Sequence, residues 1–269
     1  MSSTLHAIDA EEAVAVSGDH PLVAHLCAYP ATDLLSWRYG EAVAVSYHYW
    51  NHPSLTACGP PADVASLLLG IGASVRSWVS VPDEVLPLLP RGFLLDMHGW
   101  EFRWTYRRTG TPRDAATWLA ADDEHELRTL LATAFPDASV GWGSPRARRW
   151  AGIRDHRGRL VACAADATGR QGTGFVASIT TDPQLRGTGL GRRVTGWLVD
   201  RLVDEHGRAA LWVNGDNGPA RAVYDRLTML ALPLTAGALP AAHDLVTADT
   251  ARTGDESGET AGAAVVPVD

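Results

Sequence analysis

The stretch TDPQLRGTGLGRR, residues 181–193, decides the fold of this chain. Its three glycines, Gly187, Gly189 and Gly191, stand at alternate positions between a predicted strand and a predicted helix. Because glycine has no Cβ, the backbone can bend sharply here and bring several N–H groups toward a ligand at the helix N-terminus. The spacing therefore predicts a loop that holds a phosphate group.

The helix after this loop is evident from its apolar pattern. Leu190, Val194, Trp197, Leu198 and Leu202 recur at helical spacing. Gly207 follows the last turn, where a residue in the left-handed conformation commonly ends a helix. The three glycines are thus predicted to stand at the N-terminus of a helix.

Three arginines, Arg186, Arg192 and Arg193, crowd the same helix end. A cation there opposes the helix dipole by roughly 0.3 to 1 kcal/mol, and an anionic ligand would remove the conflict. The alternative is that these arginines simply point into solvent.

A second pattern follows the predicted strand 209–213. The stretch NGPARAVY, residues 217–224, opens another predicted helix, and Pro219 suits its first turn. Asn217, Ala220 and Tyr224 fall along one face of that helix, because they lie three and four residues apart. They can line one ligand.

Both patterns resemble one family. Gln184-Leu185-Arg186-Gly187-Thr188-Gly189 is similar to the acyl-CoA signature of the GCN5-related N-acetyltransferases (GNAT), and Asn217, Ala220 and Tyr224 match the family's second motif. The resemblance covers residues 117–230. The second motif usually continues into Gly-Phe, whereas this chain reads Leu227-Thr228-Met229-Leu230, so the last strand is not clearly predicted.

The resemblance implies direct transfer of an acetyl group from acetyl-CoA to an amine in a ternary complex, with no metal. It places the donor against Ile179, Thr180, Thr181, Arg186, Gly187, Thr188, Gly189, Leu190, Gly191, Arg192, Asn217 and Tyr224. Backbone N–H groups of residues 179–181 would stabilise the oxyanion, and Tyr224 would protonate the leaving thiolate. Ordinary sheet pairing, a purely structural Tyr224 and a helix-capping Asn217 stay open as alternatives.

No residue is predicted as the general base. The strand 175–181 has no carboxylate, and Trp212 stands where some family members have a glutamate. The conceivable bases are Asp96, His98, Glu101, Asp137 and His156, each more typical of a solvated or structural residue. Trp142, in a Gly-Trp-Gly loop, is a candidate wall of the acceptor pocket.

The predicted fold class is α/β, a GNAT fold with a mixed central sheet flanked by helices, preceded by a degenerate GNAT-like α/β half. Residues 1–108 form the predicted N-terminal domain and residues 114–245 the catalytic domain, joined by a linker-like stretch. Residues 246–269 are rich in Thr, Ala, Gly and acidic residues and are predicted to be disordered. The first half lacks the glycine pattern, so it is not expected to bind CoA. This order resembles tandem, FR47-like members of the family.

Several helices and strands are predicted around these motifs. In the first half the strands are 42–49, 54–58, 75–81 and 97–107, with helices at 62–70 and 83–89. In the second half a helix begins at a capping box of Asp123 and Glu126, and two strands, 149–154 and 159–165, precede the strand 175–181.

Composition narrows the class of protein. The 269 residues include 46% hydrophobic ones, enough for a packed core, and the formal net charge of -8 argues against a nucleic-acid surface and favours cationic or amine acceptors. The expected acceptor is a small-molecule or peptide amine. The three cysteines form no disulfide or zinc pattern, and neither a leader nor a stretch of about 18 apolar residues occurs. A cytoplasmic protein that binds neither membrane nor nucleic acid is expected; the oligomeric state is not indicated.

Two other functions compete with the acetyltransferase. A protein of the same fold that binds acyl-CoA without catalysis is the first, since no base is identified. A dinucleotide-binding enzyme is the second, but its fingerprint requires Gly-x-Gly-x-x-Gly, and position 192 is Arg.

Overall fold

The computed structural model describes residues 4–28, 34–49, 52–71, 78–169 and 172–239, and the tail predicted to be disordered lies outside them. These residues form two compact units that alternate along the chain. Unit 1 takes residues 4–17, those described between 34 and 98, and 235–239. Unit 2 takes residues 18–28 and those described between 99 and 234.

Unit 1 is a mixed sheet with helices. Its elements are β1 (His6–Ile8), α1 (Ala10–Val16), β2 (Leu35–Tyr39), β3 (Ala42–Tyr49), β4 (His52–Cys58), α3 (Pro61–Ile71), β5 (Trp78–Pro82), the 3₁₀ helix η2 (Asp83–Leu88), the start of β6 (Leu95–Thr105) and the end of β12 (Leu230–Ala238). The strand order is β1-β2-β3-β4-β5, antiparallel except for the parallel pair β4 and β5. Its core packs α3 residues such as Leu67 against Leu55 and Val79 of the sheet.

The predicted elements of unit 1 are found with small shifts, and others were missed. The predicted helix 83–89 is the 3₁₀ helix η2, which contains Pro87, a residue that disfavours a regular α-helix. The predicted strand 75–81 is described only from Trp78 onward. β1, α1 and β2 were not predicted. The capping of α1, where the Asp9 side chain accepts a bond from Glu12 N, was a readable signal.

Unit 2 is built around strands of mixed direction. Its elements are α2 (Pro21–Cys27), β7 (Thr117–Trp118), η3 (Ala121–Asp123), α4 (Glu124–Ala134), β8 (Arg149–Arg154), β9 (Leu160–Asp166), β10 (Gly174–Thr181), η4 (Pro183–Leu185), α5 (Leu190–His206), β11 (Ala209–Asn214), α6 (Gly218–Arg226) and the remaining parts of β6 and β12. The strand order is β6-β11-β10-β9-β8-β7, and only β10 and β11 run parallel to each other.

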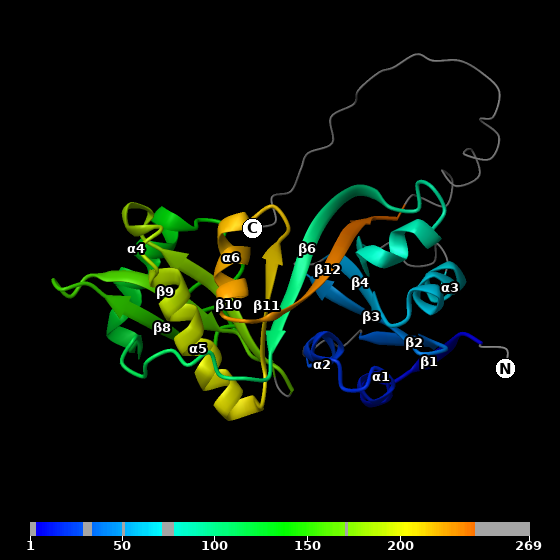
Figure 1. Cartoon of the computed structure of the whole chain (residues 1–269), viewed down its shortest axis with the longest axis horizontal. Coiled ribbons are helices and arrows are strands. Elements are labelled where there is room, and N and C mark those ends of the chain that lie inside the picture. The colour runs from blue at the N-terminus through cyan, green and yellow to red at the C-terminus, as the bar shows by residue number, and fades with distance from the viewer. Residues whose placement is uncertain (1–3, 29–33, 50–51, 72–77, 170–171, 240–269) are drawn as a thin grey trace, which may run out of the picture. The chain divides into compact units, whose positions relative to one another are not determined.

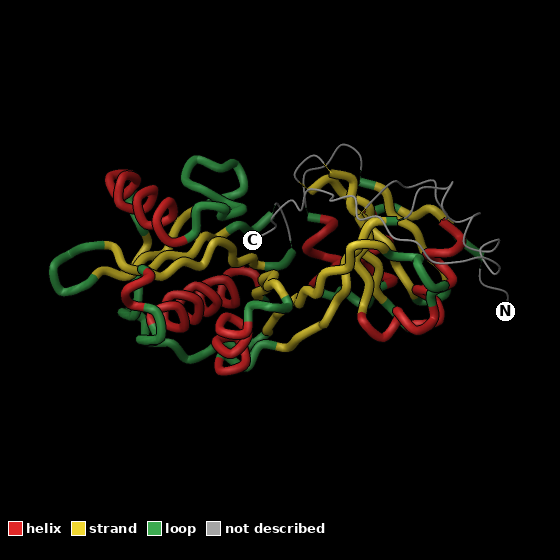
Figure 2. The backbone as a smooth tube through the Cα atoms, turned by 90° about the horizontal axis from the view of Figure 1, so that it is seen from above, coloured by secondary structure: helices red, strands yellow, loops and turns green. Residues whose placement is uncertain are grey.

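Helices cover both faces of the unit 2 sheet (Figures 1 and 2). On one face, α5 and α6 form a core in which Leu198 and Tyr224 pack with Leu211. On the other face, α4 places Leu127 against Trp150 and Cys163. Helix α5 ends at Gly207, which has the predicted left-handed conformation with φ of 74°. The sheet is therefore buried on both sides, and β10 and β11 lie at its centre.

The strand β6 belongs to unit 2 over residues 99–105, although the predicted N-terminal domain included it. Its residues 100–105 pair with the whole length of β11, from Ala209↔Thr105 to Asn214↔Trp100. Without β6 the outer backbone groups of β11 would have no strand partner, and unpaired buried backbone groups are costly. The units therefore divide at residues 98 and 99, earlier than the stretch with linker composition.

That stretch, residues 108–113, is held against α5. The buried Asp200 carboxylate accepts bonds from Thr109 N at 2.5 Å and Thr111 N at 3.1 Å, and it also pairs with Arg108 at 3.6 Å. Gly196 permits the approach, because a Cβ there would lie 2.2 Å from Thr111 Oγ1. Its loop-like composition thus reflects an irregular backbone anchored by a carboxylate.

The predicted capping box at the start of α4 is wrong. The Asp123 side chain makes no cap bond to α4, because the preceding turn η3 directs it back to Ala120 N at 2.7 Å. Its other oxygen pairs with Arg154 at 2.5 Å, and Glu126 pairs with the same arginine.

The chain after α6 forms the strand β12 despite the departure from Gly-Phe. Thr228 takes a left-handed conformation with φ of 55°, which glycine adopts without steric cost. Its neighbour Met229 is buried in the core with Tyr224. The turn that leads into β12 is thus made by a threonine in the left-handed conformation.

Candidate active site

The two central strands of unit 2 separate within the sheet. β10 and β11 pair only at Gly174↔Ala209 and Phe175↔Ala210, although β10 continues to Thr181 and β11 to Asn214. Beyond these pairs the described strands are not joined to each other. A gap thus opens in the sheet just before the glycine loop begins.

A bulge in β10 accompanies this gap. The pairing of β10 with β9 shifts between Ala177 and Thr180, and Ser178 has a left-handed φ of 48°. Before the bulge Ala177 packs on the α4 side, and after it Ile179 packs on the α5 side. Left-handed backbone costs a residue with a side chain about 1 to 2 kcal/mol, so something must hold Ser178 in place.

The bulge determines which way the backbone N–H groups point. Asp182 N donates to Val161 O of β9 at 2.9 Å. Because successive N–H groups of a strand alternate in direction, those of Ile179 and Thr181 face the opposite side, toward the gap. Thr180 pairs with Cys163 of β9, and its hydroxyl donates to Ser178 O at 3.1 Å. Of the three predicted oxyanion donors, Ile179 and Thr181 therefore direct their N–H groups to the gap, whereas Thr180 pairs within the sheet.

The glycine loop ends in an uncapped helix. Gly187 and Gly189 have φ of 80° and 87°, and a Cβ on either would meet nothing within 4 Å. Gly189 is the N-cap of α5 and supplies no side-chain bond, and the first helical bond runs from Arg193 N to Gly189 O at 3.0 Å. The N–H groups of Leu190, Gly191 and Arg192 precede that bond, as the first donors of a helix do, and an anion can accept from them.

The arginines at this helix end have different roles. Arg186 donates to Ala134 O at 3.0 Å, so it closes the end of α4, and Arg193 reaches Ala115 O at 3.4 Å. Arg192 is exposed, and no partner is found for it among the described residues. Thr188 donates its hydroxyl to Leu185 O at 2.6 Å, which tightens the loop. Of the three cations, Arg192 is the one left to meet an anion.

The second motif has a structural component. Asn217 is exposed and caps α6, since its Oδ1 accepts from Ala220 N at 3.1 Å. The alternative role predicted for Asn217, that of a helix cap, is therefore present in the structure.

Tyr224 is 5% exposed and packs among the apolar residues of the α5 face. Burial raises the pKa of its hydroxyl well above the usual value, while the nearby charge of Arg103 lowers that pKa. No hydrogen bond of the hydroxyl is found within the described residues. Tyr224 is therefore a protonated phenol at neutral pH.

A buried ionic network lies beside Tyr224. Arg103 on β6 bonds Glu101 at 2.6 Å through Nε and Asp225 at 2.6 Å through Nη1. Arg221 pairs with the other Glu101 oxygen at 2.6 Å. Glu101 was a conceivable general base, but both of its carboxylate oxygens are bonded to arginines, so neither oxygen is left to accept a proton from an amine. The network instead fixes α6, and with it Tyr224, to β6.

The remaining candidate residues are not brought to the gap by unit 2. Asp96 and His98 belong to unit 1, where His98 stacks on Trp78 at 6.0 Å. Asp137 and His156 are exposed on loops. Trp142 packs against the α4 core, as a structural tryptophan does.

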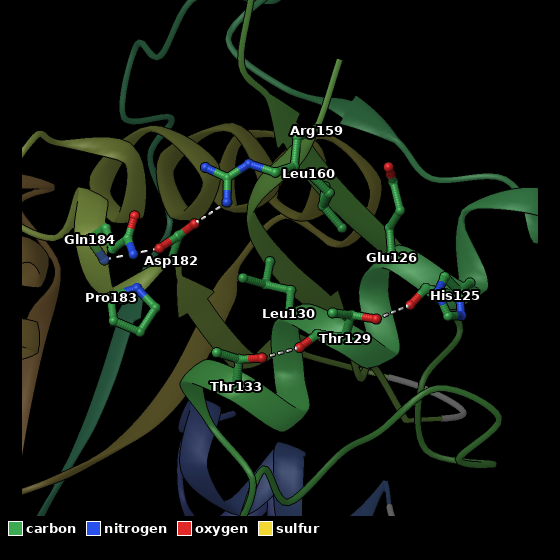
Figure 3. A pocket seen from close by; sticks show the side chains of 10 residues that line it. All are labelled: His125, Glu126, Thr129, Leu130, Thr133, Arg159, Leu160, Asp182, Pro183 and Gln184. Carbon is green, nitrogen blue, oxygen red and sulfur yellow. Dashed lines mark hydrogen bonds and ion pairs between the residues drawn. The ribbon is translucent and has the colours of Figure 1, made fainter. Parts of the chain in front are cut away.

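A cavity of about 360 Å³ opens where the glycine loop starts (Figure 3). It is lined by His125, Glu126, Thr129, Leu130, Thr133, Arg159, Leu160, Asp182, Pro183 and Gln184. Arg159 pairs with Asp182 at 2.7 Å, and Asp182 also accepts from Gln184 N at 2.9 Å. Neither Tyr224 nor residues 179–181 line it, so this cavity is separate from the gap between β10 and β11.

Other classes of site are not found in the described part of the chain. It contains no group of three or more His, Cys, Asp or Glu side chains able to hold a metal, and its cysteines are free. Burial raises the pKa of Cys163 to about 12, so this thiol is not poised as a nucleophile. None of the described helices has the length and apolarity needed to cross a membrane.

Sequence reasoning missed Ser178 and Arg103. Serine in a strand carries no signal for left-handed backbone, and the role of Arg103 depends on the pairing of β6 with β11. An arginine and a glutamate two residues apart among the aromatic residues Trp100, Phe102 and Trp104 were the available hint, since buried charges are normally paired.

Part of the chain is similar in sequence to known proteins. Residues 151–232 match the family model described as FR47-like protein. The mycothiol acetyltransferase of Frankia alni is 31% identical over 140 residues, which cover 44% of this chain and 42% of that relative. The match thus spans less than half of the relative's length.

Solved structures extend the likeness to most of the chain. A GCN5-related N-acetyltransferase from Sphaerobacter thermophilus has a TM-score of 0.53 at 13% identity and covers 89% of this chain and 96% of its own. One from Kribbella flavida has a TM-score of 0.50 at 20% identity and covers 88% and 98%. At these identities the likeness is one of fold, and it includes the mixed sheet flanked by helices. The comparisons thus show that the chain has the fold of GCN5-related N-acetyltransferases and that residues 151–232 are similar to FR47-like proteins.

Proposed function

We propose that unit 2 is an N-acetyltransferase that moves an acetyl group from acetyl-CoA directly to an amine in a ternary complex. The observation that carries the proposal is the separation of β10 from β11 immediately before an uncapped, glycine-flanked helix end. A gap with free N–H groups suits a thioester, and a free helix N-terminus suits its phosphates. The two features occur within one loop of each other.

The donor would bind through two parts of this region. Its pyrophosphate would accept bonds from the N–H groups of residues 190–192, with Arg192 adding charge and Gly187 and Gly189 leaving space. Its acyl arm would enter the gap beside Ile179 and Thr181. Asn217 and Ala220 would border the arm from the start of α6.

The chemistry then needs two groups of the protein. The amine nitrogen attacks the thioester carbon, and the N–H groups of Ile179 and Thr181 stabilise the oxyanion. As the C–S bond breaks, Tyr224 gives its proton to the sulfur and so prevents release of a free thiolate. The proton lost by the amine passes to water, because Glu101 is held by two arginines.

The acceptor is proposed to be a small-molecule or peptide amine. The net charge of -8 favours cationic acceptors in general. The name of the Frankia relative adds amines related to mycothiol to the panel of acceptors. Unit 1 is proposed as the degenerate half, which binds no donor of its own.

Release of free CoA thiol tests the proposal. Purified protein is incubated with acetyl-CoA and separate classes of amine: polyamines, amino acids, aminoglycosides, peptide N-termini and mycothiol-related amines. Thiol release that depends on one class, and that is lost in Tyr224→Phe, is the expected result. Thiol release that is independent of every amine would contradict it.

A binding protein without catalysis is the second candidate, and the engagement of Glu101 by Arg103 and Arg221 is the observation that favours it. This second candidate predicts measurable affinity for acetyl-CoA and no thiol release with any amine, in wild type and in Tyr224→Phe alike.

A further inference from the structure

A single hydroxyl joins the bulge of β10 to a neighbouring loop. Ser178 Oγ donates to Val140 O at 2.8 Å and accepts from Val140 N at 3.2 Å. Both residues are buried, Ser178 being 7% and Val140 1% exposed. The hydroxyl therefore satisfies both backbone groups of Val140, as a neighbouring strand residue would, where water cannot replace it.

Val140 lies in the segment 135–148, which connects α4 to β8. Backbone bonds within this segment form local turns, such as Ala138 N to Phe135 O and Ser144 N to Gly141 O. The bond to Ser178 ties the middle of the segment to the central strand, and the Val140 side chain packs in the α4 core. The position of this segment is thus set in part by Ser178.

The backbone of Ser178 makes the choice of serine informative. With φ of 48°, glycine would be the least strained residue at this position. A serine there is strained, and its hydroxyl is fully engaged by Val140. The side chain therefore compensates for a conformation that the bulge needs, and the bulge in turn directs the N–H groups of Ile179 and Thr181 to the gap.

We propose that Ser178 is a positioning residue that couples the segment 135–148 to the backbone N–H groups facing the gap. Its contact with Val140 holds the bulge, and a shift of either partner moves the other. The catalytic part of this inference rests on the proposed acetyl transfer, whereas the mechanical coupling does not.

Two substitutions test it with different backbone demands. Ser178→Ala removes the hydroxyl and keeps the strain of the left-handed backbone. Ser178→Gly removes the hydroxyl and relieves that strain, so the glycine variant is expected to fold. Ser144→Ala, in the same segment but without contact to β10, is the matched control. Each protein is compared with wild type by amide hydrogen exchange and by steady-state kinetics.

Faster exchange is expected in residues 136–144 and 178–181 together in both Ser178 variants, and in neither stretch in the control. We expect kcat to fall about 10- to 100-fold, less than the 10²–10³ typical for deleting one oxyanion donor, because the N–H groups persist but shift. KM for acetyl-CoA should stay within about threefold, since the glycine loop is untouched.

Unchanged exchange near Val140 in both Ser178 variants would overturn the coupling. Wild-type kcat in both variants, or a loss expressed only in KM for acetyl-CoA, would overturn the catalytic part. Should wild type release no thiol with any amine, the proposed function fails, and the exchange data still decide the coupling.

Discussion

Two strand–turn–helix connections among the described residues are of the same kind, and one of the two has the features of a site. In unit 1, β4 leads into α3, and β5 then runs parallel to β4. In unit 2, β10 leads into α5, and β11 then runs parallel to β10. β4 pairs with β3 in an unbroken register, from Val43↔Cys58 to Tyr49↔His52, whereas the register of β10 with β9 is broken by the bulge.

The turn between β4 and α3 also differs from the turn between β10 and α5 in the residues at the start of its helix. α3 begins at Pro61, directly after Gly59 and Pro60, and proline has no N–H to offer an anion. A Cβ on Gly59 would lie 2.6 Å from Ala42 Cα, so this glycine is required for packing. Gly187 and Gly189 face open space. The fold alone therefore needs no bulge in the strand before the helix, and the bulge of β10 in unit 2 is the feature that points to function.

The largest effect is expected at Tyr224, which has no counterpart in η2, the helix after β5. Tyr224→Phe should lower kcat about 10²- to 10³-fold, within the range for a general acid, and leave the Kd for acetyl-CoA unchanged. Stopped-flow or steady-state thiol release measures it, with the exposed Tyr106→Phe as control. A wild-type kcat in Tyr224→Phe would show that Tyr224 is not the general acid.

Substitutions of the glycines in the two turns are expected to affect different properties, acetyl-CoA binding at Gly189 and stability at Gly59. Gly189→Val should weaken acetyl-CoA binding about 100-fold, because its side chain fills the space of the phosphate and its φ of 87° becomes strained. Gly59→Ala should instead lower the melting temperature and leave the Kd of the folded protein unchanged. Calorimetric titration measures the Kd of both variants, and thermal unfolding measures their melting temperatures. An equal loss of affinity in both variants would contradict the proposed difference between the two turns.

Acid should weaken unit 2 through His25 of α2, which is buried and stacks on Phe175 of β10 at 3.8 Å. Burial lowers the pKa of this imidazole from 6.5 to about 3. The unfolded chain then binds the proton first, so His25 costs stability as pH falls below 6.5 and continues to do so down to about 3.

Between pH 7 and pH 5 this cost is about 2 kcal/mol, on the basis of 1.36 kcal/mol per unit. Urea unfolding at the two pH values measures it, and His25→Leu should flatten the slope by that amount. An equal slope in wild type and variant would show that His25 is not the responsible group.

The smallest effect is expected at Thr228, whose left-handed backbone is relieved by glycine. Thr228→Gly should stabilise the protein by about 0.5 kcal/mol, the relief of strain less the extra entropy of glycine in the unfolded chain. This gain contrasts with the loss in Gly59→Ala. Denaturant midpoints measure it, and a clear loss of stability would mean that the threonine side chain contributes more than its strain costs.

Local patterns predicted the glycine loop, α5 and the start of α6 well, because periodicity and capping act within a few residues. The partner of β11 was beyond such reasoning: β6 comes about a hundred residues earlier, and pairing at that range is set by the assembled sheet. The same limit applies to residues 108–113, whose composition is that of a loop but whose anchoring by Asp200 is visible only in the structure.

The candidate site was predictable in its motifs and less so in its geometry. Gly187 and Gly189 signal their backbone directly, whereas Ser178 gives no sign that it is left-handed. Arg186 was grouped with the anion-binding arginines by proximity in sequence, but its side chain reaches the end of α4 instead. Side-chain direction over several ångströms depends on neighbouring elements that one sequence does not place.

A crystal structure of the full chain with acetyl-CoA tests the central claim most directly. We predict one donor per chain, its pyrophosphate on the N–H groups of Leu190–Arg192 and its thioester oxygen within hydrogen-bond reach of Ile179 N or Thr181 N. A donor bound at the turn between β4 and α3, or in the cavity lined by His125 and Gln184 with the gap between β10 and β11 left open, would contradict the account.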